Sequence, residues 1–265
     1  MDKIGLIAGS DGLPLIFADE AAKDGKHVVA IAFRGYTSSE LDSRAQTYWL
    51  DTVNVAEVLG ILRKEGIDSL AMEGRLPHSL VLAEKDMDSG AASMLDRVRD
   101  FQTQTILRRA AGFLQELGIT VLDARTYLEP VLCPRGTLTG LKPDDSQLLD
   151  IEFGKGILEK IGPADIGQLV AVKNRTVLAV EAIEGTDAAI KRGGELGGAG
   201  VVIVKMAKPD QDMRFDLPVI GERTIKTMAG CRAGALAVES GKTVLLNRDL
   251  VIGLADKHGI TIVGV

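Results

Sequence analysis

The chain has 265 residues, enough for about two domains at roughly 150 residues each. Hydrophobic residues make up 46% of it and charged residues 26%, a balance that excludes a disordered chain. The net charge of −6 and the aromatic content of 4% argue against a nucleic-acid partner, because nothing global attracts a polyanion. Any phosphate binding must therefore be local.

The cysteine count and the hydropathy pattern point to a compartment. The two cysteines, Cys133 and Cys231, fit a reducing environment and cannot build a disulfide framework. No cleavable signal pattern opens the chain, and no apolar stretch approaches the ~18 residues of a membrane span. The sequence therefore predicts a soluble, cytoplasmic protein.

The first half alternates strand-like and helix-like segments. The apolar runs predict strands at 3–8, 27–33, 69–72 and 120–122. Helical periodicity predicts helices at 14–24, 53–64 and 91–117. This alternation predicts a Rossmann-like parallel sheet with helices on its faces, whose post-strand loops gather at one edge.

A cluster of Pro and Gly residues between 130 and 143 marks the best domain boundary, which divides the chain into residues 1–133 and 134–265. Beyond it, a helix is predicted at 144–160. Two strands at 168–173 and 176–183 are joined by Asn174-Arg175, a spacing typical of a hairpin. Further strands are predicted at 200–205, 235–238, 243–246 and 261–265. The second domain is expected to be mixed α/β.

The loop from Gly9 to Pro14 lies between the first strand and the first helix. Backbone N–H groups and a helix N-terminus in that position can hold a phosphate or a polar nucleotide edge. The loop is not the dinucleotide motif G-x-G-x-x-G, since its glycines are Gly9 and Gly12. A turn that needs glycine only for its geometry is an equally good reading.

Carboxylates crowd the end of the predicted strand 176–183. Alternation places Glu181 on the same face as Ala179 and Ile183, and burying a carboxylate there costs several kcal/mol unless it is paired or binds a metal. Glu184 and Asp187 follow within one turn. The alternative reading is a buried ion pair followed by a helix whose N-terminus Thr186 or Asp187 caps.

A second acidic run follows the strand that ends at Lys205. If it is extended, Asp212, Arg214 and Asp216 share one face. Carboxylates beside Lys and Arg at a strand end suit Mg²⁺ together with a phosphate, because oxygen ligands hold the metal and cations neutralise the transferring group. A solvated surface loop is the alternative.

Other chemistries find little support. Ser240-Gly241-Lys242-Thr243 imitates the end of a P-loop, but the required upstream glycine is Leu236 and a strand follows. The three histidines are scattered, no Cys-x-x-Cys exists, and no G-x-S-x-G elbow is present. Cys133 and Cys231 are expected to be inert.

Four motifs that occur in order resemble a known family. They are Leu6-Ile7-Ala8-Gly9-x-x-Gly12-Leu13-Pro14, Asp165-Ile166-Gly167-Gln168, Val180-Glu181-Ala182-Ile183-Glu184-Gly185-Thr186-Asp187, and the run Val204-Lys205-x-x-Lys208-Pro209-x-Gln211-Asp212-x-Arg214-x-Asp216-Leu217-Pro218-x-Ile220-Gly221. Together they are similar to the UDP-2,3-diacylglucosamine pyrophosphatases of the LpxI type. The resemblance covers essentially the whole chain.

The resemblance implies an enzyme of lipid A biosynthesis. It would hydrolyse UDP-2,3-diacylglucosamine to 2,3-diacylglucosamine 1-phosphate (lipid X) and UMP, with water attacking the α-phosphorus and with Mg²⁺ or Mn²⁺ as cofactor. The N-terminal domain would hold the UDP and the C-terminal domain the lipid, with the active site between them. It also implies a homodimer. Transient contact with the inner membrane surface would give access to the lipid.

The resemblance also assigns residues. It implies that the catalytic residues are Asp212, Asp216 and Glu181, and that the metal ligands are Asp212, Asp216, Glu184 and Asp187. The implied substrate-binding residues are Gly9, Ser10, Gly12, Leu13, Pro14, Thr186, Lys205, Lys208, Gln211 and Arg214, of which Lys205, Lys208 and Arg214 would contact the pyrophosphate. The chain departs from the family pattern at residues 86–90, where a Gly-Asp-Asp type motif is expected, so no contact is carried over there.

Two other classes of function stay open at this point. A non-catalytic nucleotide-binding module would explain the glycine loop but leaves both acidic motifs without a task. A nucleotide-sugar-dependent transferase would keep the carboxylates and change only the acceptor.

Overall fold

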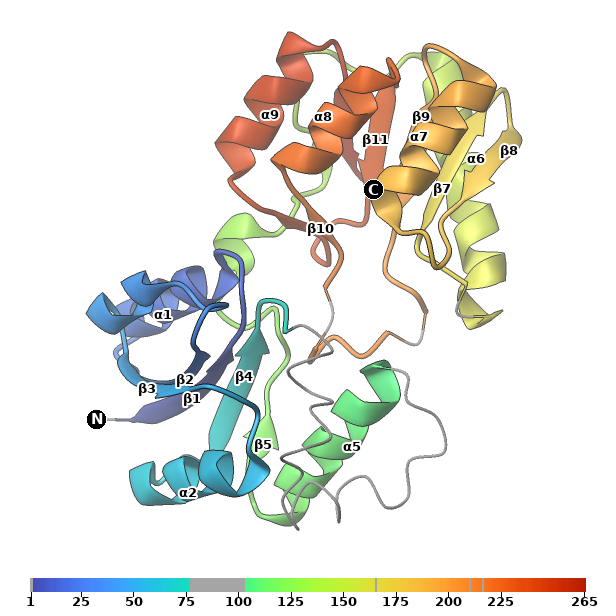
Figure 1. The fold of residues 1–265 in the computed structure, drawn as a ribbon. Coiled ribbons are helices and arrows are strands. Elements are labelled where there is room, and N and C mark those ends of the chain that lie inside the picture. Colours follow the sequence, from blue (N-terminus) through green and yellow to red (C-terminus); the bar gives the residue numbers. More distant parts are fainter. Residues whose placement is uncertain (1, 77–102, 165, 210, 216) are drawn as a thin grey trace. The chain divides into compact units, whose positions relative to one another are not determined.

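The computed structural model describes residues 2–76, 103–164, 166–209, 211–215 and 217–265. The chain forms two compact units (Figure 1). Unit 1 contains Met1–Leu128 together with Asp212–Asp216, and unit 2 contains Glu129–Gln211 and Leu217–Val265. A boundary drawn near residue 133 does not separate the short segment Asp212–Asp216, which packs in unit 1 although it lies in the second half of the sequence.

Unit 1 is built on a five-stranded parallel sheet in the order β3-β2-β1-β4-β5. Its strands are β1 (Lys3–Ala8), β2 (His27–Phe33), β3 (Gln46–Leu50), β4 (Ser69–Glu73) and β5 (Thr120–Val121). The predicted parallel α/β domain is confirmed. Strand β3 was not predicted, because its sequence QTYWL is short and only its last residue is buried.

Helices cover both faces of this sheet. They are α1 (Leu13–Lys23), α2 (Val55–Glu65) and α5 (Thr103–Glu116), with a 3₁₀ turn η1 at Ser39–Ser43. Buried side chains of α2 and α5 pack against one face of the sheet. They form one core cluster with strand residues such as Phe33 and Leu70. The helix predicted over 91–117 is seen from Thr103 onward, and its earlier part lies outside the described residues.

Unit 2 contains a mixed six-stranded sheet in the order β6-β13-β11-β9-β7-β8. Its strands are β6 (Gly136–Thr137), β7 (Leu169–Lys173), β8 (Thr176–Val180), β9 (Val202–Lys205), β11 (Ala235–Val238) and β13 (Thr261–Gly264). Strands β9, β11 and β13 are parallel, whereas β6, β7 and β8 pair antiparallel. A separate parallel pair joins β10 (Val219–Ile220) to β12 (Val244–Leu245). The predicted mixed α/β domain is confirmed.

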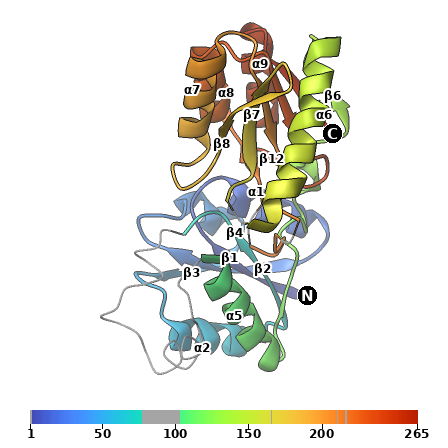
Figure 2. The ribbon, with the colours of Figure 1, turned by 90° about the vertical axis from the view of Figure 1, so that its right-hand side faces the viewer.

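Helices also sandwich the sheet of unit 2. They are α6 (Asp145–Ile161), α7 (Thr186–Gly197), α8 (Glu222–Gly230) and α9 (Arg248–Lys257), with 3₁₀ turns η3 (Glu129–Val131) and η4 (Gly162–Ala164). Helix α6 lies on one face and α7 and α8 on the other, as Figure 2 shows. Helix α6 starts with a capping box between Asp144 and Gln147.

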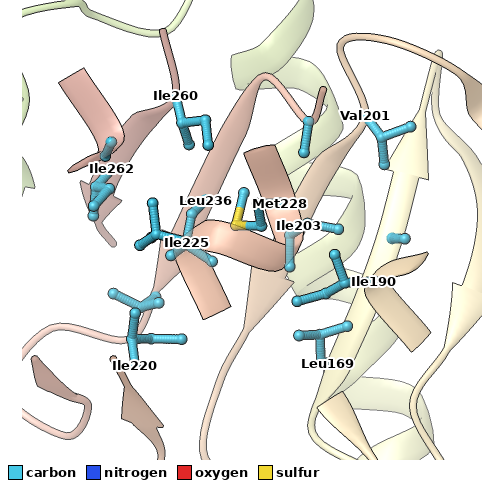
Figure 3. Close-up of a cluster of buried hydrophobic side chains, with 14 of the residues drawn as sticks. Leu169, Ile190, Val201, Ile203, Ile220, Ile225, Met228, Leu236, Ile260 and Ile262 are labelled. Carbon is cyan, nitrogen blue, oxygen red and sulfur yellow. The ribbon is translucent and has the colours of Figure 1, made fainter. Parts of the chain in front are cut away.

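Strand alternation divides the core of unit 2 into two layers. Leu169 and Ile203 point toward α7, α8 and α9 (Figure 3), whereas Val170 and Val204 pack toward α6. Successive side chains of a strand face opposite sides, so each strand contributes to both layers. The result is a sheet packed on both faces, whose strand ends can position polar side chains.

Two local predictions have different outcomes. The hairpin is confirmed, because Asn174 and Arg175 both adopt positive φ between β7 and β8, as a type I′ turn requires. The predicted strand 176–183 is too long: β8 ends at Val180, and Ile183 is fully exposed rather than on a buried face with Glu181. The chain leaves the sheet at Glu181, so alternation no longer applies.

The described part of the chain contains no helix long and apolar enough to cross a membrane.

Candidate functional site

In unit 2, a polar network connects the ends of β8 and β9. The hydroxyl of Thr186 donates to Glu181 Oε1 at 2.6 Å, and Lys205 Nζ donates to Thr186 Oγ1 at 3.0 Å. Glu181 and Lys205 are buried, and Oε2 of Glu181 has no hydrogen-bond partner among the described residues. The structure therefore brings three of the predicted site residues, Glu181, Thr186 and Lys205, into contact. A buried carboxylate oxygen without a partner is available for a ligand.

The helix that follows does not use Thr186 as its cap. Its N-cap is Gly185, which adopts φ of 82° and makes no side-chain cap. The prediction that Thr186 or Asp187 caps this helix is therefore wrong. Because Thr186 bonds Glu181 instead, its hydroxyl belongs to the polar network rather than to the helix end.

Gln168 lies beside this network, and it was not among the predicted site residues. Its backbone oxygen accepts from Met206 N at 3.0 Å, which places it beside the end of β9, and its side-chain Oε1 is buried without a partner in the described chain. The preceding residue must be glycine, because a Cβ at Gly167 would lie 2.0 Å from the backbone carbonyl oxygen of Glu181. The sequence signal was the Gly-Gln pair immediately before β7.

The other two carboxylates of this motif are occupied by arginines. Glu184 pairs with Arg192, and Asp187 pairs with Arg223 at 2.6 Å. A hydrogen bond from its own backbone N–H and the Arg192 guanidinium lower the pKa of Glu184. Both carboxylates are thus held by salt bridges within unit 2.

A tight turn follows β9. Gln211 N donates to the Lys208 oxygen at 3.0 Å, and Lys208 N donates to Gln211 Oε1 at 2.8 Å. The buried side chain of Gln211 therefore closes this turn. The turn fixes the backbone at Lys208, a predicted pyrophosphate contact.

Asp212 lies in unit 1, where Arg214 encloses its carboxylate. Arg214 Nε and Nη2 donate to the two carboxylate oxygens at 2.9 and 2.7 Å, and the Arg214 N–H adds a bond at 3.2 Å. Arg108 Nε lies 3.8 Å from Asp212 Oδ2. These contacts, led by Arg214, lower the pKa of Asp212 and keep it ionised.

The segment around Asp212 is a turn rather than an extended strand. The backbone N–H of Phe215 donates to the backbone carbonyl oxygen of Asp212 at 3.2 Å, and the side chain of Phe215 packs against the core of unit 1. The expected sharing of one face by Asp212 and Arg214 is replaced by a direct bidentate pair. The predicted site residue Asp216 lies outside the described residues.

A second Asp-x-Arg pair of the same kind lies beside it. Arg125 Nε and Nη2 donate to Asp123 at 2.9 and 2.6 Å, and the Arg125 N–H donates to Oδ1 at 2.8 Å. The charge of Asp212 acts on Asp123 and opposes the lowering of its pKa by Arg125. The sequence analysis missed this pair, although the repeated pattern Asp-Ala-Arg and Asp-Met-Arg was visible.

The loop from Gly9 to Pro14 is locked against the chain that follows β4. The backbone N–H of Gly9 donates to the backbone carbonyl oxygen of Glu73 at 2.7 Å, and the backbone N–H of Ser10 donates to that of Arg75 at 2.9 Å. These two N–H groups already donate hydrogen bonds within the fold. A phosphate would therefore bind the later N–H groups, at Gly12 and the start of α1. Leu13 and Pro14 have buried side chains.

Glu73 is a further residue that the sequence analysis did not single out. It is 3% exposed and its Oε1 has no hydrogen-bond partner within the described ranges. Burial, and then the charge of Asp123, raise the pKa of Glu73 to about 9. A carboxyl group of this kind is neutral near pH 7. The signal in the sequence was a Glu that ends the apolar strand SLAME.

The described residues do not form a ready metal cage. They contain no group of three or more His, Cys, Asp or Glu side chains that could hold a metal ion. Asp212, Glu184 and Asp187 each pair with an arginine instead. A divalent cation at these described carboxylates would therefore need substrate phosphates to complete its set of oxygen ligands.

Cysteine chemistry has no place in either cluster. Cys133 is buried, and burial raises the pKa of its thiol to about 11. Burial likewise raises the pKa of the half-buried Cys231. Both thiols are protonated at neutral pH, as expected for inert cysteines.

Comparison with known proteins matches both halves of the chain. The family model described as LpxI N-terminal domain matches residues 3–131, and the one described as LpxI C-terminal domain matches residues 134–263. A relative in Caulobacter vibrioides, the UDP-2,3-diacylglucosamine pyrophosphatase LpxI, is 30% identical over 280 aligned positions, which cover 100% of this chain and 98% of the relative.

Solved structures show only distant likeness. The biotin carboxylase domain of Hydrogenobacter thermophilus 2-oxoglutarate carboxylase aligns with 66% of this chain and 35% of its own at 14% identity and a TM-score of 0.28. The N5-carboxyaminoimidazole ribonucleotide synthetase of Thermotoga maritima aligns with 64% of this chain and 38% of its own at 18% identity and a TM-score of 0.25. Likeness at this level carries no functional argument.

Proposed function

Because the chain belongs to the LpxI family, we propose that it hydrolyses the pyrophosphate bond of UDP-2,3-diacylglucosamine in lipid A biosynthesis. The products are UMP and 2,3-diacylglucosamine 1-phosphate (lipid X). The observation that supports this proposal best is the arginine-clasped Asp212, an ionised carboxylate flanked by two arginines in a motif that the family resemblance marks as essential.

The proposed reaction is an attack of water on the α-phosphorus. The water oxygen forms the new bond to that phosphorus, the bond to the bridging oxygen breaks, and the water protons leave to solvent and to the sugar 1-phosphate. The low pKa of Asp212 makes it suited to orient the water by accepting a hydrogen bond. Its arginine partner sets the direction of the carboxylate.

Positively charged side chains would neutralise the charge of the pyrophosphate. We assign this role to Arg214, Lys205 and Lys208. Lys205 is buried and held by Thr186, and Arg214 is fixed by Asp212, so both charges are positioned before substrate arrives. Such preorganised charge is usually the largest contribution to catalysis of this kind. The loop from Gly9 to Pro14 is assigned to the UDP.

Incubation of the protein with UDP-2,3-diacylglucosamine and Mg²⁺ in ¹⁸O-labelled water tests the proposal. Label in UMP supports attack at the α-phosphorus, and label in the sugar phosphate indicates attack at the other phosphorus. Transfer of the nucleotide or sugar to an added acceptor without label would indicate a transferase. Nucleotide binding without any product would indicate a binding module and would overturn the proposed activity.

We also propose that the protein reaches its lipid substrate from the cytoplasm by transient contact with the inner membrane, and that it acts as a homodimer. The substrate carries two acyl chains, and the described helices offer no membrane span. Co-sedimentation with lipid vesicles and light scattering of the purified protein measure these two properties separately.

A further inference from the structure

Glu73 lies at the edge of the sheet of unit 1 where ligands are expected. It ends β4 and is in register with Ala8, the last residue of the parallel strand β1. In open α/β sheets, ligands bind outside the carboxyl ends of the strands. The β4 residues Leu70 and Met72 face the core formed with α2 and α5, so alternation places Glu73 on the opposite face.

Backbone contacts place Glu73 beside the loop from Gly9 to Pro14. The backbone carbonyl oxygen of Glu73 accepts a hydrogen bond from the backbone N–H of Gly9. Ser10 and Arg75 form an isolated antiparallel bridge. A Cβ at Gly9 would meet the Arg75 oxygen at 2.5 Å, and one at Gly74 would meet the Ser10 oxygen at 2.1 Å. Both glycines are therefore required for the close approach of the loop to the residues that follow β4.

The carboxyl group of Glu73 is incompletely satisfied. Oε1 is buried, and no described residue bonds it. A buried oxygen without a partner costs about 1–3 kcal/mol, and native proteins seldom keep one without a reason. A bound ligand that supplies the missing partner is such a reason.

The charges near Glu73 restrict the chemistry of that ligand. Asp123 is the charged group that acts on Glu73, and it disfavours ionisation of the carboxyl group. A neutral carboxyl group presents an O–H donor next to a C=O acceptor. That pair matches an uncharged group that both donates and accepts a hydrogen bond.

We propose that Glu73 recognises the nucleoside of the nucleotide bound at the Gly9–Pro14 loop, through its donor O–H and its acceptor oxygen. The partner is an uncharged donor-and-acceptor group, either the imide edge of a pyrimidine base or the ribose hydroxyls. The choice of a nucleotide as ligand rests on the proposed function, and the role of Glu73 deepens it by naming the recognised part.

Equilibrium binding to the full-length protein separates these possibilities. The probes are UMP, ribose 5-phosphate and inorganic phosphate, and the variants are Glu73→Gln and Glu73→Leu. The glutamine amide keeps a donor beside an acceptor, so Glu73→Gln is expected to retain UMP binding. Glu73→Leu is expected to weaken UMP binding by about tenfold or more and to leave the binding of phosphate unchanged. Equal loss for ribose 5-phosphate identifies the ribose hydroxyls, and loss for UMP alone identifies the base.

Glu65→Leu is the matched control. Glu65 is in the same unit but pairs with Lys3 at the start of β1, at the opposite end of the strands, so its replacement should leave UMP binding unchanged. Thermal unfolding verifies that each variant is folded. The proposal is overturned if folded Glu73→Leu binds UMP like the wild type, if Glu73→Gln loses binding equally, or if the wild type does not bind UMP. Wild-type hydrolysis, measured separately, reports on the proposed function alone.

Discussion

The backbone N–H of Ala124 donates to the carbonyl oxygen of Met213 at 2.8 Å. Each of these residues is the middle of an Asp-x-Arg segment, so one backbone bond joins two carboxylate–guanidinium pairs from distant parts of the sequence. It ties the segment Asp212–Asp216 to the chain that follows β5. The position of Asp212 therefore depends on the fold of unit 1.

Replacement of Asp212 tests the centre of the proposed site. Asp212→Asn keeps the shape of the side chain but removes the charge that Arg214 and Arg108 surround. We expect UMP release to fall by about 10²–10³, as when one preorganised electrostatic group is lost, with little change in thermal unfolding. Asp68→Asn, at an exposed position of the same unit, is the control. Wild-type turnover in Asp212→Asn would exclude a catalytic role.

The pH profile tests the partnership of Arg214 with Asp212. Arg214 is the main cause of the lowered pKa of Asp212. In Arg214→Gln that pKa returns toward its ordinary value, so Asp212 becomes protonated at a higher pH. We expect the acidic limb of the rate profile to move to higher pH, in addition to any loss of rate. An unmoved limb in an active variant would show that Asp212 ionisation does not control the rate.

Thr186 connects two buried charged groups of unit 2, Glu181 and Lys205. Thr186→Val keeps the volume but removes the hydroxyl that bonds Glu181 and Lys205. We expect loss of activity of at least about tenfold, and Thr186→Ser should restore most of it because serine keeps the hydroxyl. Steady-state kinetics on both variants, with thermal unfolding as the check on folding, make the comparison. Equal activity of the valine and serine variants would contradict a role for the hydroxyl.

The buried Glu73 predicts an unusual pH dependence of stability. Its pKa is about 9 in the folded protein but near 4.5 when unfolded. As pH rises between these values, the unfolded chain releases the proton and the folded protein does not, so stability falls. Glu73→Gln removes this loss, and we expect its gain in unfolding free energy to be about 2–4 kcal/mol larger at pH 8 than at pH 5.

Denaturant unfolding at the two pH values measures this difference. Glu65→Gln is the control, because Lys3 and Tyr48 lower the pKa of Glu65 to about 2. Glu65 is ionised in both states between pH 5 and 8, so its replacement has the same effect at both. A Glu73→Gln effect that did not depend on pH would show that Glu73 is ionised in the folded protein.

Removal of divalent cations tests the expected cofactor. Mg²⁺ is commonly held by one or two carboxylates together with substrate phosphates, so it need not find a complete protein cage. We expect excess EDTA to abolish UMP release, and added Mg²⁺ or Mn²⁺ to restore it. Activity that is indifferent to the chelator would remove the metal from the proposed function.

The sequence by itself determined the elements and the class of fold. The apolar runs of β1 and β2, the hairpin turn at Asn174-Arg175 and the capped helix α6 follow from local patterns. These features were predictable because burial periodicity and turn chemistry act over a few residues. The crowding of Glu181 and Thr186 was visible for the same reason.

Only the tertiary structure decided which polar groups meet. It turned Arg214 back onto Asp212, ended β8 before Ile183, and placed Asp212 in unit 1 beside Asp123. It also showed that Glu73 is buried without a partner for Oε1. These relationships depend on contacts between residues far apart in the chain, and on how much water each carboxyl group keeps. Local sequence patterns carry no information on either, so the charge state of each carboxyl group follows from the fold.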